Sequence, residues 1–415
     1  MLLSIHIISA QNDFEQYKKD REEAFSAYKD SVQARYSEYT KKEKEAREQF
    51  KKDVKRKWQE YKESTNKTYM SYSQDMEARA GIYFEDGYIE LEAIIEEGSD
   101  DGSLNFHYNK IYDSVLASDL SNRPLAITSI LFTMSHSFWE LQKGSDKKRG
   151  FQSGRFLKVS KKLVRQFLDI FNEKAGDGYH LLKDQIATSA GKLINTTEAA
   201  SGFINDILKK KLKKGKKYKS KDGRAWSSYT IKIPLRPEHK IVRKERYEDE
   251  IKYQSERFNI SFPIAMAITE TESSFNPKAT SHVPAYGLMQ LVPSTGARDA
   301  YAYVYNKDKF LSKRYLYDPK NNIELGCAYI ARIRHGYLKS IYDDEKAYMC
   351  TVAAYNTGPG NVAKTLTNTK KLAPATRKAN SMSESQLYLK LVQDLEYKET
   401  RDYLKKVWSR KEKYQ

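Results

Sequence analysis

The sequence predicts a mainly α-helical protein in three parts. The first part repeats aromatic residues every eleven positions, which is the spacing of a long helix. The last part, from about residue 241, carries apolar residues three and four positions apart, which indicates packed helices. The middle part, residues 76–240, contains segments that alternate apolar and polar residues, as strands do. We therefore expect a small α+β domain between two helical parts.

Residues 1–10 form a short apolar stretch that ends in small residues. This pattern resembles the core and cleavage site of a secretory signal peptide, although no Lys or Arg precedes it. We interpret it as a signal peptide with a shortened start. The alternative is a frayed hydrophobic terminus.

Residues 11–75 are almost entirely charged, polar and aromatic, and they contain the eleven-residue repeat. One aromatic series is broken only by Arg47, and a second series follows three positions later. Eleven residues make three helical turns, so both series face one stripe of a long helix. This narrow stripe should pack on a partner helix, a second copy of the chain or the next domain, with carbohydrate stacking as the alternative. The two series are Phe14, Phe25, Tyr36, Trp58 and Tyr69, and Tyr17, Tyr28, Tyr39, Phe50, Tyr61 and Tyr72.

Residues 81–84 and 88–95 read as the two strands of a β-hairpin. Asp86 and Gly87 lie between them, and this dipeptide favours a type I′ turn because it tolerates positive φ at both central positions. No catalytic constellation is visible in this middle domain. The other elements expected there are a strand over residues 226–235 and helices over residues 125–141 and 156–171.

The chain is strongly basic. Lys and Arg outnumber Asp and Glu by 73 to 55, which gives a net charge of +18 and implies an anionic partner. Nucleic acid, an acidic membrane surface and an anionic cell wall all qualify. The densest basic run, residues 209–217, is expected to be a flexible, solvated loop, with contact to an anionic wall or phospholipid as the alternative. No apolar run approaches the length of a transmembrane helix.

Glu272 ends an apolar helical stripe in the last part of the chain. Ile264 and Ile268 lie four residues apart, Glu272 follows four residues later, and Phe275 follows three after that. A carboxyl group on the packed side of a helix is shielded from water, which favours its protonated form and suits a general acid. Glu270 points to nearly the opposite face and is expected to be a solvated surface acid.

Two further segments carry groups that suit a sugar-binding site. Gly287 would let the backbone approach a sugar closely, and the amide of Gln290 can both donate to and accept from an N-acetyl group. Tyr355 ends a helix that Gly358, Pro359 and Gly360 stop. Taken alone, each segment is also typical of ordinary helix packing.

Histidine and cysteine give little functional signal. His282 and His335 have no second ligand at a metal-binding spacing, so surface roles are expected and neither a metal nor a cofactor is predicted. Cys327 and Cys350 both fall in apolar helical segments. Packing inside helices is the favoured interpretation, and a single disulfide in an oxidising compartment is the alternative.

The segments around Glu272, Gln290 and Tyr355 together resemble the soluble-lytic-transglycosylase domain. That family has a goose-lysozyme-like α-helical fold and cleaves the glycan strands of bacterial peptidoglycan. The likeness rests on five ordered motifs over about 150 residues and extends more weakly upstream, to membrane-bound members of the family. The motifs are residues 271–277, 287–290, 317–329, 354–360 and 399–404, with weaker matches at 82–87 and 236–239.

The resemblance implies a lysozyme-like catalytic domain over residues 241–415 and specific roles within it. Glu272 would act first as acid and then as base on the bond between N-acetylmuramic acid and N-acetylglucosamine, giving a 1,6-anhydro product. Tyr355 would hydrogen-bond this acid, and Glu399 matches the second acidic residue of the family. The remaining residues that match positions lining the family's groove are Ser273, Met289, Gln290, Asn356 and Tyr329.

The resemblance also implies a place and partners for the protein. We expect peptidoglycan strands as the partner, in the periplasm and in association with the outer membrane. Anchoring through an N-terminal Cys is in doubt, because no Cys lies near the start of this sequence. The N-terminal helix could in addition mediate self-association or bind another protein.

Three alternatives remain. A lysozyme-type hydrolase would share the acid and the fold but release a reducing sugar. A catalytically weak wall-binding scaffold would explain the long helix and the basic charge, although Glu272, Gln290 and Tyr355 are intact. A nucleic-acid-binding protein fits the charge alone and leaves the five motifs unexplained, so we expect no nucleic-acid partner.

Overall fold

The computed structural model describes residues 2–98 and 147–415. It divides into two compact units, residues 1–61 and 62–415, which are considered separately. The expected helix at residues 125–141 lies outside the described residues. Helices predominate, and one antiparallel sheet lies in the second unit, as the sequence predicted.

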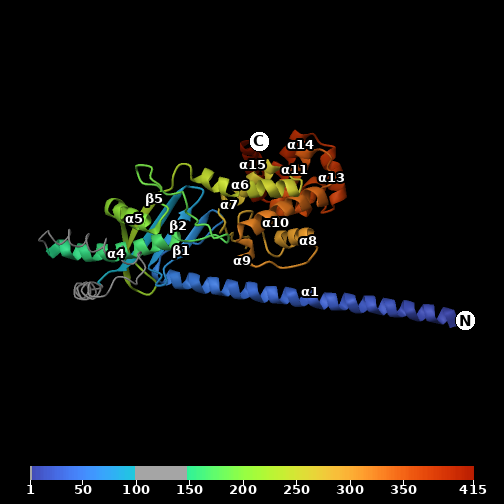
Figure 1. Cartoon of the computed structure of the whole chain (residues 1–415), viewed down its shortest axis with the longest axis horizontal. Helices are drawn as coiled ribbons and strands as arrows, with labels where there is room; N and C mark the ends of the chain where they lie inside the picture. Colours follow the sequence, from blue (N-terminus) through green and yellow to red (C-terminus); the bar gives the residue numbers. More distant parts are fainter. Residues whose placement is uncertain (1, 99–146) are drawn as a thin grey trace. The chain divides into compact units, whose positions relative to one another are not determined.

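The first unit is built on one long helix, α1, over Leu2–Lys57 (Figure 1). Its aromatic side chains Phe14, Tyr17, Tyr28 and Tyr39 are exposed. Where α1 ends, the Trp58 N–H donates to the Val54 carbonyl. These four aromatic side chains are therefore uncovered, whereas Trp58 of the same series is 4% exposed, and the role of the repeat stays a prediction.

The expected extension of this helix to residue 75 is wrong. Residues Thr68–Tyr72 form strand β1, which pairs antiparallel with strand β2, Ala78–Tyr83. The Tyr72 hydroxyl donates to the backbone of Lys62. Tyr69 and Tyr72 fit the aromatic lattice, but long-range pairing with β2 overrides that local periodicity, because strand preference depends on the neighbouring strand.

The second unit contains a sheet region, residues 62–238, with five strands in the order β1-β2-β3-β5-β4. Helix α4 packs on strands β2 and β3, and α5 packs on α4. The side chains between them form a buried apolar core that includes Ile82, Leu91, Leu163 and Phe167. The other elements of this region are β3 Tyr88–Glu96, α4 Lys147–Phe171, α5 Thr197–Lys211, β4 Lys213–Lys219 and β5 Ala225–Pro234.

The predicted hairpin is present, but its turn differs from the predicted one. Tyr83 and Tyr88 form the last pair of the ladder, so four residues rather than two make the connection. Gly87 has a φ of 74°, and its N–H donates to the Tyr83 carbonyl at 2.8 Å. A Cβ atom at Gly87 would lie 2.5 Å from His239 Nε2. Contact with His239, and not the Asp86-Gly87 dipeptide alone, thus shapes this loop.

The basic run is not a loop. Residues 209–211 complete the last turn of α5, and 213–217 lie in β4, an edge strand whose lysines are mostly exposed. The last helical turn favours positive side chains through the helix dipole, and lysines along an edge strand discourage pairing with other chains. The prediction that these lysines are solvated is confirmed, but their backbone forms a helix end and a strand instead of a loop.

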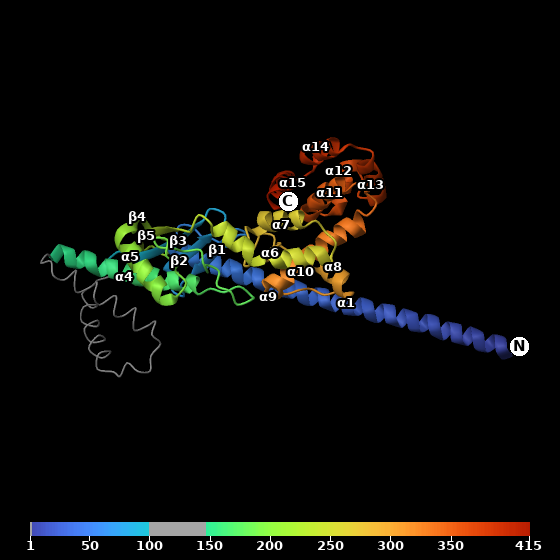
Figure 2. The same ribbon diagram turned by 45° about the horizontal axis from the view of Figure 1, so that its top comes forward.

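The helical region, residues 239–415, packs around helix α7. Helices α6, α11 and α15 contact α7, and α11 to α15 gather together in Figure 2. One continuous apolar core joins them. The elements are α6 His239–Arg257, α7 Phe262–Ser273, α8 Gly296–Tyr305, α9 Lys313–Leu316, α10 Pro319–Ala331, the π-helical turn η2 Arg332–Tyr337, α11 Asp344–Thr357, α12 Pro359–Thr367, α13 Leu372–Asn380, α14 Glu384–Asp394, α15 Lys398–Lys411 and the 3₁₀ turn η3 Glu412–Tyr414.

Arg243, on α6, joins the sheet region to the helical region. Its guanidinium donates to the Phe84 carbonyl at 2.7 Å and to the Ser274 carbonyl at 3.1 Å. It also donates to Gln185 Oε1 and lies 3.0 Å from His239 Nδ1. The side chain is 1% exposed. One buried cation thus donates hydrogen bonds to backbone carbonyls of both the hairpin loop and the turn after α7.

We expect Arg243→Met to lower the free energy of unfolding by about 3 kcal/mol or more, because it leaves two buried carbonyls without donors. Chemical denaturation measures this loss. Arg246→Met is the matched control: Arg246 lies one turn further along α6, is partly exposed and donates to the His180 carbonyl at 3.2 Å. Equal losses in the two variants would contradict the role given to Arg243.

Candidate active site

Glu272 lies in the last turn of α7, at the end of the apolar stripe that the sequence predicted. Ile264, Ile268 and Phe275 on this stripe are buried. Pro263 occupies the first turn of the helix, as expected, while the predicted cap, Ser261, makes no side-chain capping bond. Glu272 itself is partly exposed. Its carboxyl therefore lies at the edge of the packed core.

The environment of Glu272 favours its protonated form. Burial is the main cause and raises its pKa to about 8, against the interaction with the Tyr403 hydroxyl, which lowers the pKa. The negative charge of Glu399 raises the pKa further, and the positive charge of Lys67 lowers it. A carboxyl with this pKa carries a proton at neutral pH and can still give it up, as an acid–base catalyst must.

Helix α15 brings two of these groups to the site. Glu399 and Tyr403 are four residues apart, so they share one face of the helix. Glu399 is exposed and acts on Glu272 through its charge, whereas Tyr403 is buried. Sequence motifs included Tyr403 but gave it no role. The signal that could have found it is the four-residue spacing from Glu399.

The loop that carries Gln290 is fixed by two side chains from distant helices. Asn322 accepts from the Met289 N–H at 2.7 Å and donates to the Tyr286 and Leu316 carbonyls. The Tyr355 hydroxyl donates to the Met289 carbonyl at 2.8 Å. Both backbone groups of Met289 are thus held, so this loop enters the site already ordered.

Gln290 carries a buried acceptor that is unused among the described residues. Its φ is 48°, and its Nε2 donates to the Gly287 carbonyl at 3.0 Å. Its Oε1 is buried, and within the described residues it has no hydrogen-bond partner. A buried carbonyl oxygen without a donor is costly, so a ligand N–H or O–H would stabilise it.

Aromatic rings extend the site on the side of Tyr355. The rings of Tyr355 and Tyr329 lie 5.3 Å apart between centroids. Tyr329 in turn lines an open hollow of about 460 Å³ together with Arg298, Asp299 and Tyr337. Glu272 does not line this hollow, so the hollow adjoins the acid through the two tyrosines.

Residues 249–377 match the family model described as Transglycosylase SLT domain. This part of the chain is therefore similar to the transglycosylase SLT domain. The match includes Glu272, Gln290 and Tyr355, and it ends before Glu399 and Tyr403.

Similar proteins carry related names. The chain is 32% identical over 235 residues to the membrane-bound lytic murein transglycosylase C of Edwardsiella ictaluri, covering 56% of this chain and 62% of that protein. It is 32% identical over 236 residues to the protein of the same name from Haemophilus influenzae strain PittEE, covering 56% and 63%. The chain thus spans a little under two thirds of the length of these relatives.

Solved structures of lytic transglycosylases are also similar. The 70 kDa soluble lytic transglycosylase of Escherichia coli shares 26% identity at a TM-score of 0.31, over 40% of this chain and 24% of that one. The lytic transglycosylase Slt of Pseudomonas aeruginosa, solved as an inactive mutant, shares 16% identity at a TM-score of 0.29, over 70% and 50%.

Three predicted roles in the SLT domain need correction. Ser273 is fully buried and donates to the Thr269 carbonyl, so its side chain does not line an open groove. Met289 is also fully buried, and a Cβ atom at Gly326 would meet its sulfur. Gly287, with a φ of 79°, approaches Asn322 and the Leu316 carbonyl closely, so protein packing already requires a glycine there.

The resemblance implied that Tyr355 would hydrogen-bond Glu272, but Tyr355 does not. Its hydroxyl donates to the Met289 carbonyl, and the negative charge of Glu272 raises the pKa of both Tyr355 and Tyr403. Asn356 is partly exposed, and its Oδ1 accepts from Thr400 at 2.6 Å, which links α11 to α15 beside Glu399.

Glu270 is not the solvated acid that the helical stripe suggested. It is 9% exposed, accepts from Tyr414 at 2.9 Å and Lys413 at 3.2 Å, and lies 3.6 Å from Arg410. The C-terminal residues of the chain fold over this face of α7. Periodicity identified the opposite faces of the helix correctly, but it could not show that both are covered.

The remaining candidates have structural roles. His282 and His335 are exposed, which fits the predicted surface roles, and His335 contacts the Asn259 carbonyl. Cys327 and Cys350 are free thiols and fully buried, so the packing interpretation is confirmed. Across residues 2–98 and 147–415, no three His, Cys, Asp or Glu side chains converge as a metal site would require.

The raised pKa of Glu272 should appear as a pH-dependent stability. In the unfolded chain this carboxyl ionises at its model value of 4.5, whereas in the folded protein it does so at about 8. The folded state therefore binds more protons between these values, and stability is lost as pH rises through them. Relative to Glu272→Gln, the wild type should lose a few kcal/mol across this interval, since one unit of pKa difference corresponds to about 1.4 kcal/mol.

Urea denaturation of both proteins at pH 4.5, 6 and 8 measures this difference. Ionisable groups that are unchanged between the two proteins cancel in the comparison. A constant difference at all three pH values would show that Glu272 titrates normally.

Proposed function

We propose that this protein is a peptidoglycan lytic transglycosylase with a lysozyme-like catalytic domain. It cleaves the β-1,4 bond between N-acetylmuramic acid and N-acetylglucosamine without water and leaves a 1,6-anhydro end. The SLT domain and the names of the relatives support the activity. The observation that carries the mechanism is Glu272, a partly exposed acid whose pKa is raised by burial to about 8.

One carboxyl group can serve both halves of this reaction. Protonated Glu272 gives its proton to the glycosidic oxygen, and that bond to C1 breaks. The substrate's own N-acetyl carbonyl stabilises the charge that develops at C1. The Glu272 carboxylate then removes the proton from the C6 hydroxyl, whose oxygen bonds to C1. The proton lost in the first step returns in the second, so the enzyme is regenerated.

The groups around Glu272 support both steps. The Tyr403 hydroxyl stabilises the carboxylate formed after the first step, while burial and the charge of Glu399 keep the acid protonated before it. Gln290 offers its free Oε1 to an N-acetyl or hydroxyl group. Tyr329, which lines the adjoining hollow, provides a face for a sugar ring, and Asn356 offers a polar group at the edge.

The substrate determines the expected location. Peptidoglycan lies outside the cytoplasmic membrane, so we place the protein in the periplasm, and the relatives' names point to membrane association. Among the helices that the structure describes, none has an apolar stretch able to cross a bilayer. The net charge of +18 would favour approach to an anionic wall.

Digestion of purified sacculi with mass analysis of the released muropeptides tests this proposal. The wild type should release 1,6-anhydro muropeptides, and Glu272→Gln should lower the rate at least about 100-fold, because the amide has no proton to transfer. Glu270→Gln makes the same atomic change on the same helix and should keep its activity below its melting temperature. Reducing-end products would instead indicate a lysozyme-type hydrolase, and no release would indicate a binding protein.

Helix α1 is proposed as a docking arm rather than as part of the catalytic machinery. Removing residues 2–57 should leave the cleavage of soluble glycan fragments largely unchanged and should alter attachment to sacculi or self-association. Ala46→Pro should act like the deletion, because proline breaks a helix in its interior, and Ala46→Ser is its control. The deletion stops before residues 65–72, because these belong to the second unit. Loss of soluble-fragment cleavage would show that α1 completes the catalytic site.

A further inference from the structure

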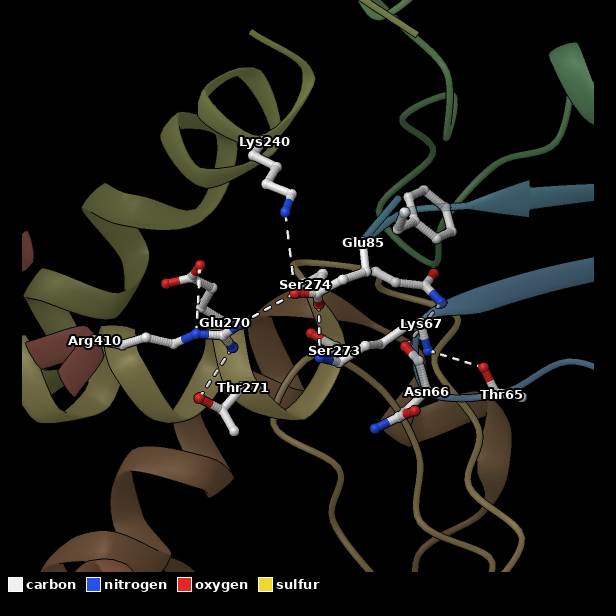
Figure 3. A network of polar contacts seen from close by, with 12 residues as sticks. Thr65, Asn66, Lys67, Glu85, Lys240, Glu270, Thr271, Ser273, Ser274 and Arg410 are labelled. Carbon is white, nitrogen blue, oxygen red and sulfur yellow. Dashed lines mark hydrogen bonds and ion pairs between the residues drawn. The ribbon is translucent and has the colours of Figure 1, made fainter. Parts of the chain in front are cut away.

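The loop before strand β1 lies against the turn that follows Glu272. The Asn276 amide donates to the Asn66 carbonyl at 3.3 Å, and the Thr280 N–H donates to the Thr65 carbonyl at 3.4 Å. Lys67 follows in the same loop (Figure 3). A segment 200 residues earlier in the sequence, which carries no family motif, therefore borders the proposed catalytic acid.

This turn is conformationally costly and needs such support. Ser274 and Phe275 have φ values of 51° and 59°, in the left-handed region. Non-glycine residues there cost about 1–3 kcal/mol each unless their surroundings hold them. Arg243 holds the Ser274 carbonyl, and Glu85 accepts from the Ser274 hydroxyl. The end of the Glu272 helix is thus fixed by the sheet region.

Glu85, in the hairpin loop of the sheet region, gathers three cations. It pairs with Lys67 at 2.6 Å, Arg410 at 3.1 Å and Lys240 at 4.0 Å. Burial would raise the pKa of Glu85, but hydrogen bonds from Lys67 and Ser274 outweigh burial and lower the pKa to about 2. Glu85 is therefore ionised at all working pH values, and it holds Lys67 in one place.

Of these three cations, Lys67 is the one in the loop that lies against the turn after Glu272, and its positive charge lowers the pKa of Glu272. The other groups that act on Glu272 are Tyr403 and Glu399 of α15, and Tyr355 of α11 lies close enough to feel its charge. A tyrosine stabilises an anion only by hydrogen bonding, and Glu399 destabilises it. Lys67 supplies the positive charge on this side of the acid.

We propose that Lys67 is a positioning residue of the active site, supplied by the sheet region, which is held by Glu85 and stabilises the Glu272 carboxylate formed after the first proton transfer. This inference rests on the proposed function. It means that the sheet region takes part in catalysis, because docking of its loop sets the charge around the acid. If Glu85 only joined the sheet region to the helical region by an ion pair, Lys240 or Arg410 would be a sufficient partner, and Lys67 would not be needed.

The pH profile of cleavage distinguishes these two roles. Activity requires protonated Glu272, so the rate falls at alkaline pH as that proton is lost. Removing the charge in Lys67→Met should move this alkaline limb to higher pH by roughly half a unit, since a nearby cation favours the ionised form. Lys67→Arg should restore the wild-type limb. Lys240→Met, which removes an equal charge from the same Glu85, should leave the limb in place.

Glu85→Gln gives a shift of opposite sign. In this variant the backbone bonds at Thr65 and Asn66 still hold the loop that carries Lys67, but the anion that partly neutralises Lys67 is lost, so the alkaline limb should move to lower pH. If Lys67→Met does not fold, this variant and Lys67→Arg still test the inference. Identical limbs in all folded variants would show that Lys67 only fastens the interface.

A second measurement separates failure of this inference from failure of the proposed function. The stability difference between the wild type and Glu272→Gln reports the ionisation of Glu272 without any substrate. The same comparison can be made between Lys67→Met and the double variant that also carries Glu272→Gln. The pH at which Glu272 ionises in the folded protein should then be higher, even if no muropeptide is released. Cleavage with this pH unshifted would leave the function intact and overturn the role of Lys67.

Discussion

The buried guanidinium of Arg243 is the interaction on which the arrangement of this protein depends. It reaches the carbonyl of Phe84 in the sheet region and that of Ser274 directly after α7, the helix that carries Glu272. Burial lowers the pKa of Arg243 to about 9, which reflects the cost of keeping a cation away from water. That cost is offset only while all of its acceptors stay in place, so the sheet and helical regions form one compact unit.

The same constraint explains how an acid can be both buried and available. Helix α7 ends in two left-handed residues, which turn the chain away as soon as Glu272 has been placed. The carboxyl is left at the edge of an apolar core, where water is scarce and the proton is retained. Tyr403 and Lys67 oppose this effect from two sides, and their balance with burial and Glu399 decides when the proton leaves.

Most motif residues in this chain stabilise the fold, and few of them offer a group to a ligand. Asn322, Tyr355 and Gly287 fix the loop that carries Gln290, and Gln290 itself keeps a buried acceptor without a partner among the described residues. Ser273 and Met289 are buried within the fold. A motif residue therefore does not have to touch a ligand, because a loop can be positioned only if buried polar groups hold its backbone.

Local pattern in the sequence was enough to identify the Glu272 stripe, the hairpin strands and the helix α1, because each depends on spacing along one element. It also gave the SLT resemblance, whose motifs lie close together in the chain. The tertiary structure alone decided that residues 68–72 pair as a strand, that Glu270 is covered, and that the Tyr355 hydroxyl donates to the Met289 carbonyl. Lys67 belongs to this second group. These outcomes depend on contacts between residues far apart in sequence, where hydrogen bonding and burial override periodicity.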